Sequence, residues 1–227
     1  MPRETLTKEQ ILRAAVEVLD AEGVAGLNMR RLGAQLGVAS TATYYYVKNK
    51  DELVTSAADL VWHEIELPYS GGDDWRSAAT VLAHEVYAMI GRHFWLLAAM
   101  STHVIYGPGK ARFDECGLGI FERAGFAGRD ADRAAATVLM YVIGAAQGSA
   151  AERAWEARLR RDGGDIAARQ SDVLAFVTEA ARQFPRLRAR LESPDAVEIL
   201  PGSSGFEFGL RTVLDGLQAR LAVAQEK

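Results

Sequence analysis

Residues 26–53 read GLNMRRLGAQLGVASTATYYYVKNKDEL, and this stretch decides the fold. Asn28 can cap a helix over 29–36, because an asparagine side chain accepts a hydrogen bond from a backbone amide of the first turn. Gly37 ends that helix, and a second short helix is expected over 40–44. Two helices joined by a short turn that contains glycine form a helix-turn-helix, although any tight helical hairpin can show the same pattern.

Helical signals continue on both sides of this stretch. Thr7 and Gln10 form a capping box at the start of a helix that Gly23 ends, and Asn49 can cap a helix over 50–64. Later apolar residues recur at helical spacing, and no convincing strand is visible. Further helices are expected at about 74–91, 94–102, 110–124, 130–159, 166–183 and 206–224, with a short helical turn ending near residue 191. The sequence therefore predicts an all-α protein.

The charge of the chain is unevenly distributed. The 227 residues hold 26 Lys and Arg against 30 Asp and Glu, a formal net charge of −4. Residues 23–50 nevertheless contain no acidic residue, and their basic residues are Arg30, Arg31, Lys48 and Lys50. A compact basic surface on an otherwise acidic protein is typical of a module that contacts phosphates, although chance depletion in a short window gives the same pattern.

Several classes of protein are not expected from this sequence. The one cysteine, Cys116, excludes an internal disulfide framework. The N-terminus shows no signal peptide, and no uninterrupted apolar run approaches the ~20 residues of a membrane-spanning helix, so we expect a cytoplasmic protein without membrane contact. His84-Glu85 lacks the second histidine of a zinc-protease motif, since residue 88 is alanine. We expect no catalytic residues, no metal site and no cofactor.

Two segments carry a resemblance to a known family. The run R-x-L-x-x-x-L-G-V over 30–38, followed by TYYYVKNKDEL, closely resembles the DNA-binding domain of the tetracycline-repressor (TetR) family. The match covers about residues 7–53. FEFGLRTVLDGL over 206–217 resembles the last helix of that family's C-terminal domain. The resemblance implies an N-terminal three-helix helix-turn-helix domain over 1–50 and a larger helical ligand-binding and dimerisation domain over 51–227.

The same resemblance implies a function. We expect a ligand-responsive transcriptional regulator, a repressor, that binds a palindromic double-stranded DNA operator as a homodimer and is released by a small effector. The helices over 130–159 and 206–224 are the candidates for the dimer interface. The first contains Gly144 and Gly148, which allow close approach of two backbones, and the second is apolar on more than one stripe. Both helices could instead be internal core.

The chemistry of the helix-turn-helix residues suggests how each would contact DNA. Arg30 can donate two hydrogen bonds to one guanine, and the short hydroxyls and methyl groups at the start of the second helix can reach base edges. Tyrosine hydroxyls and lysine ammonium groups suit phosphates; the resemblance points Tyr44 and Tyr46 toward DNA and leaves Tyr45 open. These charges could also be merely solvated. The expected DNA contacts are Arg30, Ser40, Thr41, Ala42, Tyr44, Tyr46, Lys48 and Lys50.

The middle of the chain would hold the effector. Isolated polar residues lie within or next to apolar runs there, and a buried polar group needs a partner, which is either a ligand or a protein carbonyl. The residues expected to bind the effector are His84, Tyr87, Phe94, Met100, His103, Phe113, Tyr141 and Gln147.

Gly33 has a separate expected role in the helix-turn-helix. Because glycine has no side chain, Gly33 would let the two helices pack closely.

Other interpretations remain open from the sequence. The effector is not implied to be tetracycline, because the histidine ligands of the magnesium-tetracycline site cannot be matched to the four histidines of this chain. A regulator controlled by a protein partner would carry the same helix-turn-helix. A helical small-molecule-binding or sequestering protein without DNA binding is the alternative from another class, and it would have no use for the acid-free window over 23–50.

Overall fold

The computed structural model describes residues 6–68, 74–193 and 203–225, and every regular element in them is a helix, which confirms the all-α prediction. The helices are α1 (Lys8–Gly26), α2 (Met29–Gln35), α3 (Ser40–Thr43), α4 (Lys50–Trp62), α5 (Trp75–Arg92), α6 (Trp95–Thr102), α7 (Pro108–Ala124), α8 (Arg129–Arg161), α9 (Ile166–Arg182), α10 (Pro185–Leu191) and α11 (Ser203–Gln225).

The capping residues explain why the helices begin where they do. Thr7 and Gln10 form the expected capping box at α1. The Asn28 side chain accepts a hydrogen bond from the Arg31 amide at 2.9 Å, and Asn49 does the same for the Glu52 amide at 2.8 Å. Each cap satisfies an amide that has no partner within its own helix, so these helix starts follow from local sequence alone.

Two helix ends differ from the sequence expectation. Gly23 adopts a left-handed conformation with a φ of 69°, as a helix-ending glycine would, but a further helical turn follows it and α1 continues to Gly26. At the other end of the chain, α11 begins at Ser203, three residues earlier than expected. The expected loops over 68–74 and 193–205 lie largely outside the described residues.

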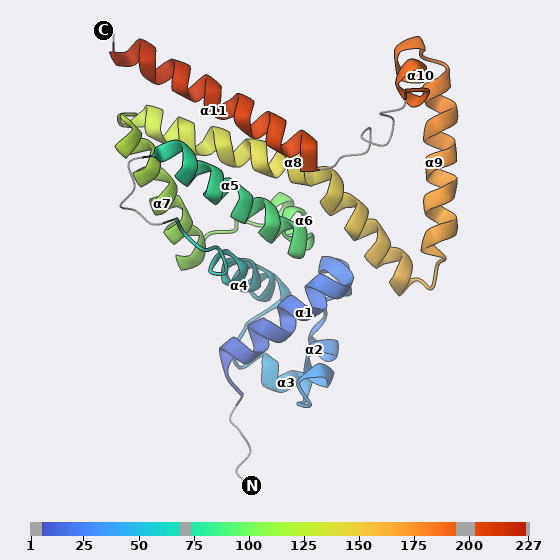
Figure 1. Cartoon of the computed structure of the whole chain (residues 1–227). Coiled ribbons are helices and arrows are strands. Elements are labelled where there is room, and N and C mark those ends of the chain that lie inside the picture. Colours follow the sequence, from blue (N-terminus) through green and yellow to red (C-terminus); the bar gives the residue numbers. More distant parts are fainter. Residues whose placement is uncertain (1–5, 69–73, 194–202, 226–227) are drawn as a thin grey trace.

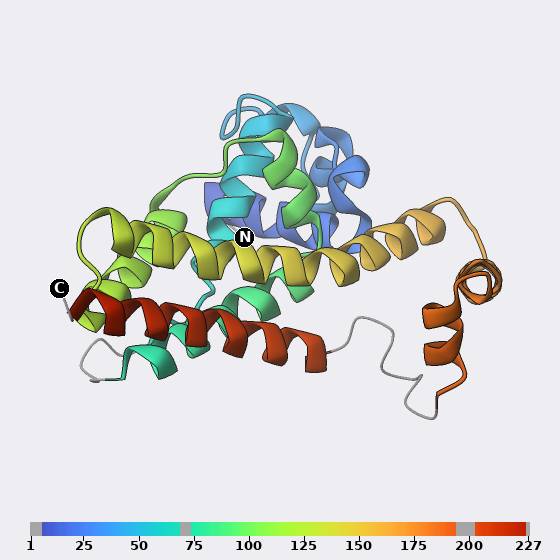
Figure 2. The ribbon, with the colours of Figure 1, turned by 90° about the horizontal axis from the view of Figure 1, so that it is seen from above.

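The helices form two regions, which are joined by α4 and by the packing of α1 on α8 and α6. Figure 1 shows α1, α2 and α3 at one end of the molecule, α8 and α11 at the other, and α4 leading from the first region into the second. Helix α4 packs against α1 and also against α7 and α6. In Figures 1 and 2, α8 and α11 run side by side, and α5 and α7 also pack against α8.

Helices α9 and α10 form an arm to one side of this body (Figures 1 and 2). Neither helix has a buried residue, and the main packing partners of α9 are α10 and α8. The arm nevertheless carries exposed large apolar side chains: Val173, Leu174, Phe176, Val177, Phe184 and Leu187. No other part of the described chain covers these side chains.

Helix α8 is long and apolar enough to cross a membrane by length and composition alone. Its neighbours within the chain are α1, α5, α6, α7, α9 and α11, as for a core helix of a globular domain. Much of its apolar surface is nevertheless exposed; Met140, for example, is 71 % exposed. This outward apolar face has no partner within the described chain.

Gly33 is required where α2 packs on α3. A Cβ atom at this position would lie 2.9 Å from the Val38 carbonyl oxygen and 3.1 Å from the Ser40 Cα, and both are backbone atoms that cannot rotate away. The turn between the helices contains Gly37 with a φ of 66°, a conformation that glycine adopts without strain. The expectation that Gly33 allows close packing is therefore confirmed.

We predict that Gly33→Ala destabilises the protein by about 1–3 kcal/mol, because the added methyl group forces α2 and α3 apart. The measurement is urea unfolding at fixed protein concentration. Gly91→Ala is the matched control, since a Cβ there meets no atom within 4 Å. Gly91 lies within α5, so that change should be neutral or stabilising. Equal urea midpoints for Gly33→Ala and the wild type would contradict the packing argument.

Candidate DNA-binding surface and effector pocket

The helix-turn-helix presents most of the expected DNA-contacting residues to solvent. Arg30, Thr41 and Lys48 are exposed, Tyr44 is about half exposed, and Ser40 and Ala42 are partly exposed. All of them lie on or near α2 and α3, at the end of the molecule away from α8 and α11 (Figure 1). No described side chain pairs with the Arg30 guanidinium or the Lys48 ammonium, so both charges are free for an anionic partner.

The three consecutive tyrosines do not lie on one continuous helix. Helix α3 ends at Thr43, which is buried, and residues 44–46 form a turn. The Tyr46 hydroxyl donates to the Leu6 carbonyl oxygen, and its ring packs against the core. Tyr46 therefore points inward, whereas the resemblance to the family points it outward toward DNA. Tyr45, which was left open, is 92 % exposed instead. Helical spacing could not rank these side chains, because the helix stops before them.

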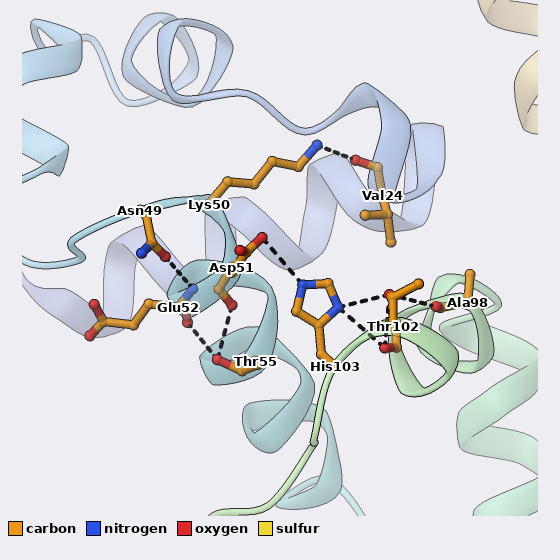
Figure 3. Close-up of polar contacts among 10 residues, drawn as sticks. Val24, Asn49, Lys50, Asp51, Glu52, Thr55, Ala98, Thr102 and His103 are labelled. Atoms are coloured by element: carbon orange, nitrogen blue, oxygen red, sulfur yellow. Dashed lines mark hydrogen bonds and ion pairs between the residues drawn. The ribbon is translucent and has the colours of Figure 1, made fainter.

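Lys50 also differs from expectation. Its ammonium donates to the Val24 carbonyl oxygen at 2.7 Å, across from the first turn of α4 to the last turn of α1 (Figure 3). The contact satisfies a carbonyl oxygen that has no partner at the helix end. In this arrangement Lys50 fastens α4 to α1 and does not extend toward a phosphate. The sequence shows a cationic residue at this position, but it does not reveal that the end of α1 lies beside it.

The effector-sized space lies between α5, α7 and α8. A cavity of about 430 Å³ opens there, within the range of small-molecule sites. Its walls are mostly apolar, and the charged exceptions are Lys110, Asp114 and Asp132. The lining consists of Ala79, Leu82, Ala83, Val86, Tyr106, Lys110, Phe113, Asp114, Gly117, Leu118, Phe121, Asp132, Ala135, Ala136, Val138, Leu139 and Val142.

Phe113 alone among the expected effector contacts lines this cavity. His84, Tyr87 and Tyr141 instead surround the ring of Phe206 on α11. Tyr87 stacks on that ring with centroids 4.1 Å apart, His84 meets its edge at 5.2 Å, and the Tyr141 hydroxyl donates to the Phe206 carbonyl oxygen at 2.7 Å. Burial raises the pKa of Tyr141. The partners of His84, Tyr87 and Tyr141 are therefore other groups of the protein, and these contacts hold α11 on α5 and α8.

The remaining expected effector contacts lie elsewhere. Phe94 is buried in the core, Met100 is partly buried, and Gln147 is exposed on α8. His103, directly after α6, has its Nε2 atom 3.3 Å from a carboxylate oxygen of Asp51 in the first turn of α4 (Figure 3). That histidine therefore joins two helices of different regions and does not line the cavity.

Lys110 is the charged residue of the cavity that sequence reasoning missed. Its ammonium pairs with Asp114 one turn further along α7 and lies 5.2 Å from the ring centre of Trp62 and 5.3 Å from that of Phe113. A favourable cation–aromatic contact requires an ammonium near a ring face at such a distance. The sequence feature that could have indicated this site is the spacing of Lys110, Phe113 and Gly117. This spacing puts a charged group, an aromatic ring and a position without a side chain on one face of α7.

The start of α7 is tightly fastened to the end of α4. The Lys110 amide donates to the Asp59 carboxylate at 3.0 Å, and Arg112 donates to the Ile65 carbonyl oxygen at 2.7 Å. Gly107 and Gly109 approach Asp59 so closely that a Cβ atom at either position would clash with it. One wall of the cavity is thus rigidly connected to the helix that leads to the helix-turn-helix. Among the described residues, no group of three His, Cys, Asp or Glu side chains could hold a metal ion.

Comparison with known proteins gives a consistent picture. Residues 11–57 match the family model described as bacterial regulatory proteins, tetR family, and residues 67–221 match the tetracyclin repressor-like C-terminal domain. The transcriptional repressor DrrR1 of Streptomyces coeruleorubidus is 32% identical over 97% of this chain and 80% of its own length. The class A tetracycline repressor protein of transposon 1721 in Escherichia coli is 28% identical over 97% of this chain and 94% of its own.

Solved structures agree with the sequence relatives. The Streptomyces coelicolor TetR-family protein ActR, in complex with actinorhodin, superposes with a TM-score of 0.74 and 25% identity, over 96% of this chain and 97% of its own. Regulators of this family are generally DNA-binding proteins and not enzymes, bind operators as dimers and respond to small-molecule effectors. A sequestering protein without DNA binding is not favoured. The chain belongs to the tetR family of bacterial regulatory proteins and is a ligand-responsive, DNA-binding transcriptional repressor.

Proposed function

We propose that the exposed surface of α2 and α3 binds the operator through Arg30, Ser40, Thr41, Ala42, Tyr44 and Lys48, and that Tyr45 joins them. Arg30 and Lys48 lie on an acid-free stretch and have no protein partner in the described chain. Tyr46 and Lys50 then act indirectly, since Tyr46 holds the segment before α1 and Lys50 holds the end of α1. In this proposal the protein acts in the cytoplasm, and the support is that its relatives are bacterial transcription regulators.

The cavity between α5, α7 and α8 is the effector site in this proposal. Its apolar walls suit a molecule with a ring system, and the Lys110–Asp114 pair gives such a molecule one polar anchor. ActR, which matches the whole chain in fold, was solved with actinorhodin bound. Actinorhodin is accordingly the first probe to test on this protein.

The single observation that supports release of DNA by the effector is the rigid connection between the cavity wall and α4. An effector that displaces the start of α7 should also displace Asp59 and Trp62 on α4, because the Lys110 amide is bonded to the Asp59 carboxylate, Gly109 packs against the Asp59 carbonyl oxygen, and the Lys110 ammonium lies over the Trp62 ring. A ligand shifts the protein away from DNA only if it prefers a conformation that spaces the recognition helices differently. A coupling free energy of ~1–3 kcal/mol would lower operator affinity roughly 5- to 150-fold.

We further propose that the homodimer forms through the outward faces of α8 and α11. Met140 on α8 and Phe208 on α11 are 71 % and 74 % exposed, although both are large and apolar. A Cβ atom at Gly144 or Gly216 would meet no atom within 4 Å, so a partner helix can approach both helices closely. Leu214 and Leu217 are buried within the chain itself, and they belong to the internal packing of α11 on its neighbours.

The first prediction from this proposal concerns DNA. Arg30→Ala should cost about 1–3 kcal/mol of operator binding and relax the preference at one base pair, because a bidentate contact to a base is lost. Lys48→Ala should weaken all sequences alike and reduce the slope of log affinity against log salt by about one. Fluorescence anisotropy with operator and scrambled duplexes measures both. Arg182→Ala, an exposed arginine on α9, is the control. Unchanged binding in both test variants would place the contact surface elsewhere.

The second prediction concerns the dimer. Met140→Glu combined with Phe208→Glu should give a monomer at micromolar concentration in sedimentation velocity, because two carboxylates cannot be buried unpaired in an apolar interface. Val104→Glu makes the same kind of change at a residue that is 89 % exposed outside α8 and α11, and it should leave the dimer intact. A dimer in the double variant would exclude this interface.

The third prediction tests the effector site. Gly117→Leu places a side chain in the cavity, and it should weaken binding of actinorhodin by at least about tenfold, which is ~1.4 kcal/mol. Gly119→Leu makes the same substitution two residues along α7, outside the cavity lining, and should bind the probe like the wild type. Calorimetry measures binding with and without operator. Reciprocity requires that operator weaken probe binding by the factor by which the probe weakens operator binding. Equal probe affinities with and without operator would remove the release mechanism even if the cavity binds.

A further inference from the structure

His93 is a buried histidine whose two ring nitrogens both face carboxylates. The residue is 5 % exposed and lies at the end of α5, one residue before Phe94 leads into α6. Its Nδ1 atom is 2.7 Å from a carboxylate oxygen of Asp20 on α1. Its Nε2 atom is 3.0 Å from a carboxylate oxygen of Glu64, directly after α4. One imidazole thus connects the helix-turn-helix region, the end of α4 and the corner between α5 and α6.

The other charged and polar groups around this contact are few. The Trp95 indole donates to the same Asp20 oxygen at 2.7 Å, and the Arg92 guanidinium donates to the same Glu64 oxygen at 3.4 Å. From α8, the Arg153 guanidinium donates to the Gly91 carbonyl oxygen. Asp20 and Glu64 are therefore the two anions that face His93, and Arg92 is the cation next to Glu64.

This geometry requires a protonated ring. A neutral imidazole donates from one nitrogen only, so it would leave the other lone pair facing a carboxylate oxygen. An imidazolium donates from both nitrogens and neutralises part of the negative charge. Burial by itself lowers the pKa of His93, but the hydrogen bonds to Asp20 and Glu64 and the charges of these carboxylates outweigh it, and the pKa is raised.

We propose that His93 is a positioning residue for operator binding: as an imidazolium it clasps α1 to the effector region and thereby fixes the orientation of the recognition helix. The proposal rests on operator binding by a dimer. Two recognition helices match a palindrome only if each is held at a defined angle to the dimer body. Without the His93 contact, the helix-turn-helix region must be ordered when it binds DNA, and the free-energy cost of this ordering lowers operator affinity.

The proposal gives a definite dependence on pH. Because the clasped arrangement raises the pKa of His93, protonation strengthens the clasp. That contribution is fully present below the ordinary histidine pKa of ~6.5 and is lost as the pH rises through the raised value. Operator affinity should therefore fall with rising pH, in a step that lies above the ordinary titration range of histidine.

The experiment measures the ratio of operator to scrambled-DNA affinity for the full-length dimer from pH 5.5 to pH 9. Taking this ratio removes the general effect of pH on binding to phosphates. The wild-type ratio should fall on the order of tenfold through the step. His93→Gln should start from a low ratio and show no step. Glu64→Gln keeps a hydrogen-bonding group but removes one anion, and it should move the step to lower pH.

Two matched histidine variants serve as controls. His84→Gln changes a half-exposed histidine that pairs with Glu207 between α5 and α11, and it should keep the wild-type step. His103→Gln removes the contact between His103 and Asp51 of α4, and it should also keep the step. A step that disappears in His103→Gln and persists in His93→Gln would overturn the proposal.

A direct measurement does not depend on how the variants fold. The ¹⁵N chemical shifts of the two His93 ring nitrogens report protonation in the wild-type protein. Both nitrogens should stay protonated to a higher pH than those of a histidine model peptide measured under the same conditions. A His93 that loses its proton at or below the pH of the model peptide, or an operator ratio in His93→Gln that equals the wild type at pH 6, would overturn the proposal. If the wild type showed no preference for any operator, the proposed function would be contradicted. The ¹⁵N measurement would still test separately whether His93 is protonated.

Discussion

Both regions of the molecule pack against helix α4, so the position of this helix constrains how the two regions are placed. Its buried residues Leu53, Val54 and Ala57 belong to the same core as the apolar face of α1, and Trp62 near its end lies against Phe113 of α7. Protein interiors are close-packed and do not deform continuously. A change at α7 therefore reaches α1 as a shift of the whole helix. The cavity and the recognition helix are connected through this rigid element, and α1 also packs directly on α8, which lines the cavity.

The sequence predicted the helices well because helix starts are local events. Asn28, Asn49 and the Thr7 capping box determine where three helices begin, and each acts within four residues of itself. Gly33 was equally readable, since a glycine inside a short helix next to a tight turn has few explanations other than close packing. Family resemblance at the two ends then extended this reading to the function of the chain.

The cavity could not be read in the same way. A cavity is a difference between the volume that three helices enclose and the volume that their side chains fill, and no single stretch of sequence reports it. The search for polar groups among apolar residues found His84 and Tyr141, whose partners are other protein groups. Lys110 was passed over, because a lysine on a helix is ordinarily solvated and its proximity to Trp62 arises only when α4 and α7 meet.

The same limit applies to Lys50 and Tyr46, whose partners are backbone carbonyl groups that lie 26 and 40 residues away in the sequence. Their donor groups suit phosphates, but a backbone carbonyl oxygen accepts hydrogen bonds from the same donors.

The contacts between the two regions differ in kind along α4. Apolar packing of α4 on α1 and α7 fixes which helices touch, and it depends little on pH or salt. The polar contacts sit at the edges of that packing: His103 with Asp51 near the start of α4, and His93 with Glu64 just beyond its end. Buried charge pairs contribute little net stability but impose geometry, because an imperfect pair leaves a costly unpaired charge. Of the two histidines only His93 is buried, and the Asp51 side chain is 79 % exposed. The apolar packing therefore holds the regions together, and in our proposal the buried contact of His93 sets the angle between them. That angle is the quantity that an operator reads in a dimer, so a contact just beyond the end of α4 can govern binding without loosening the fold.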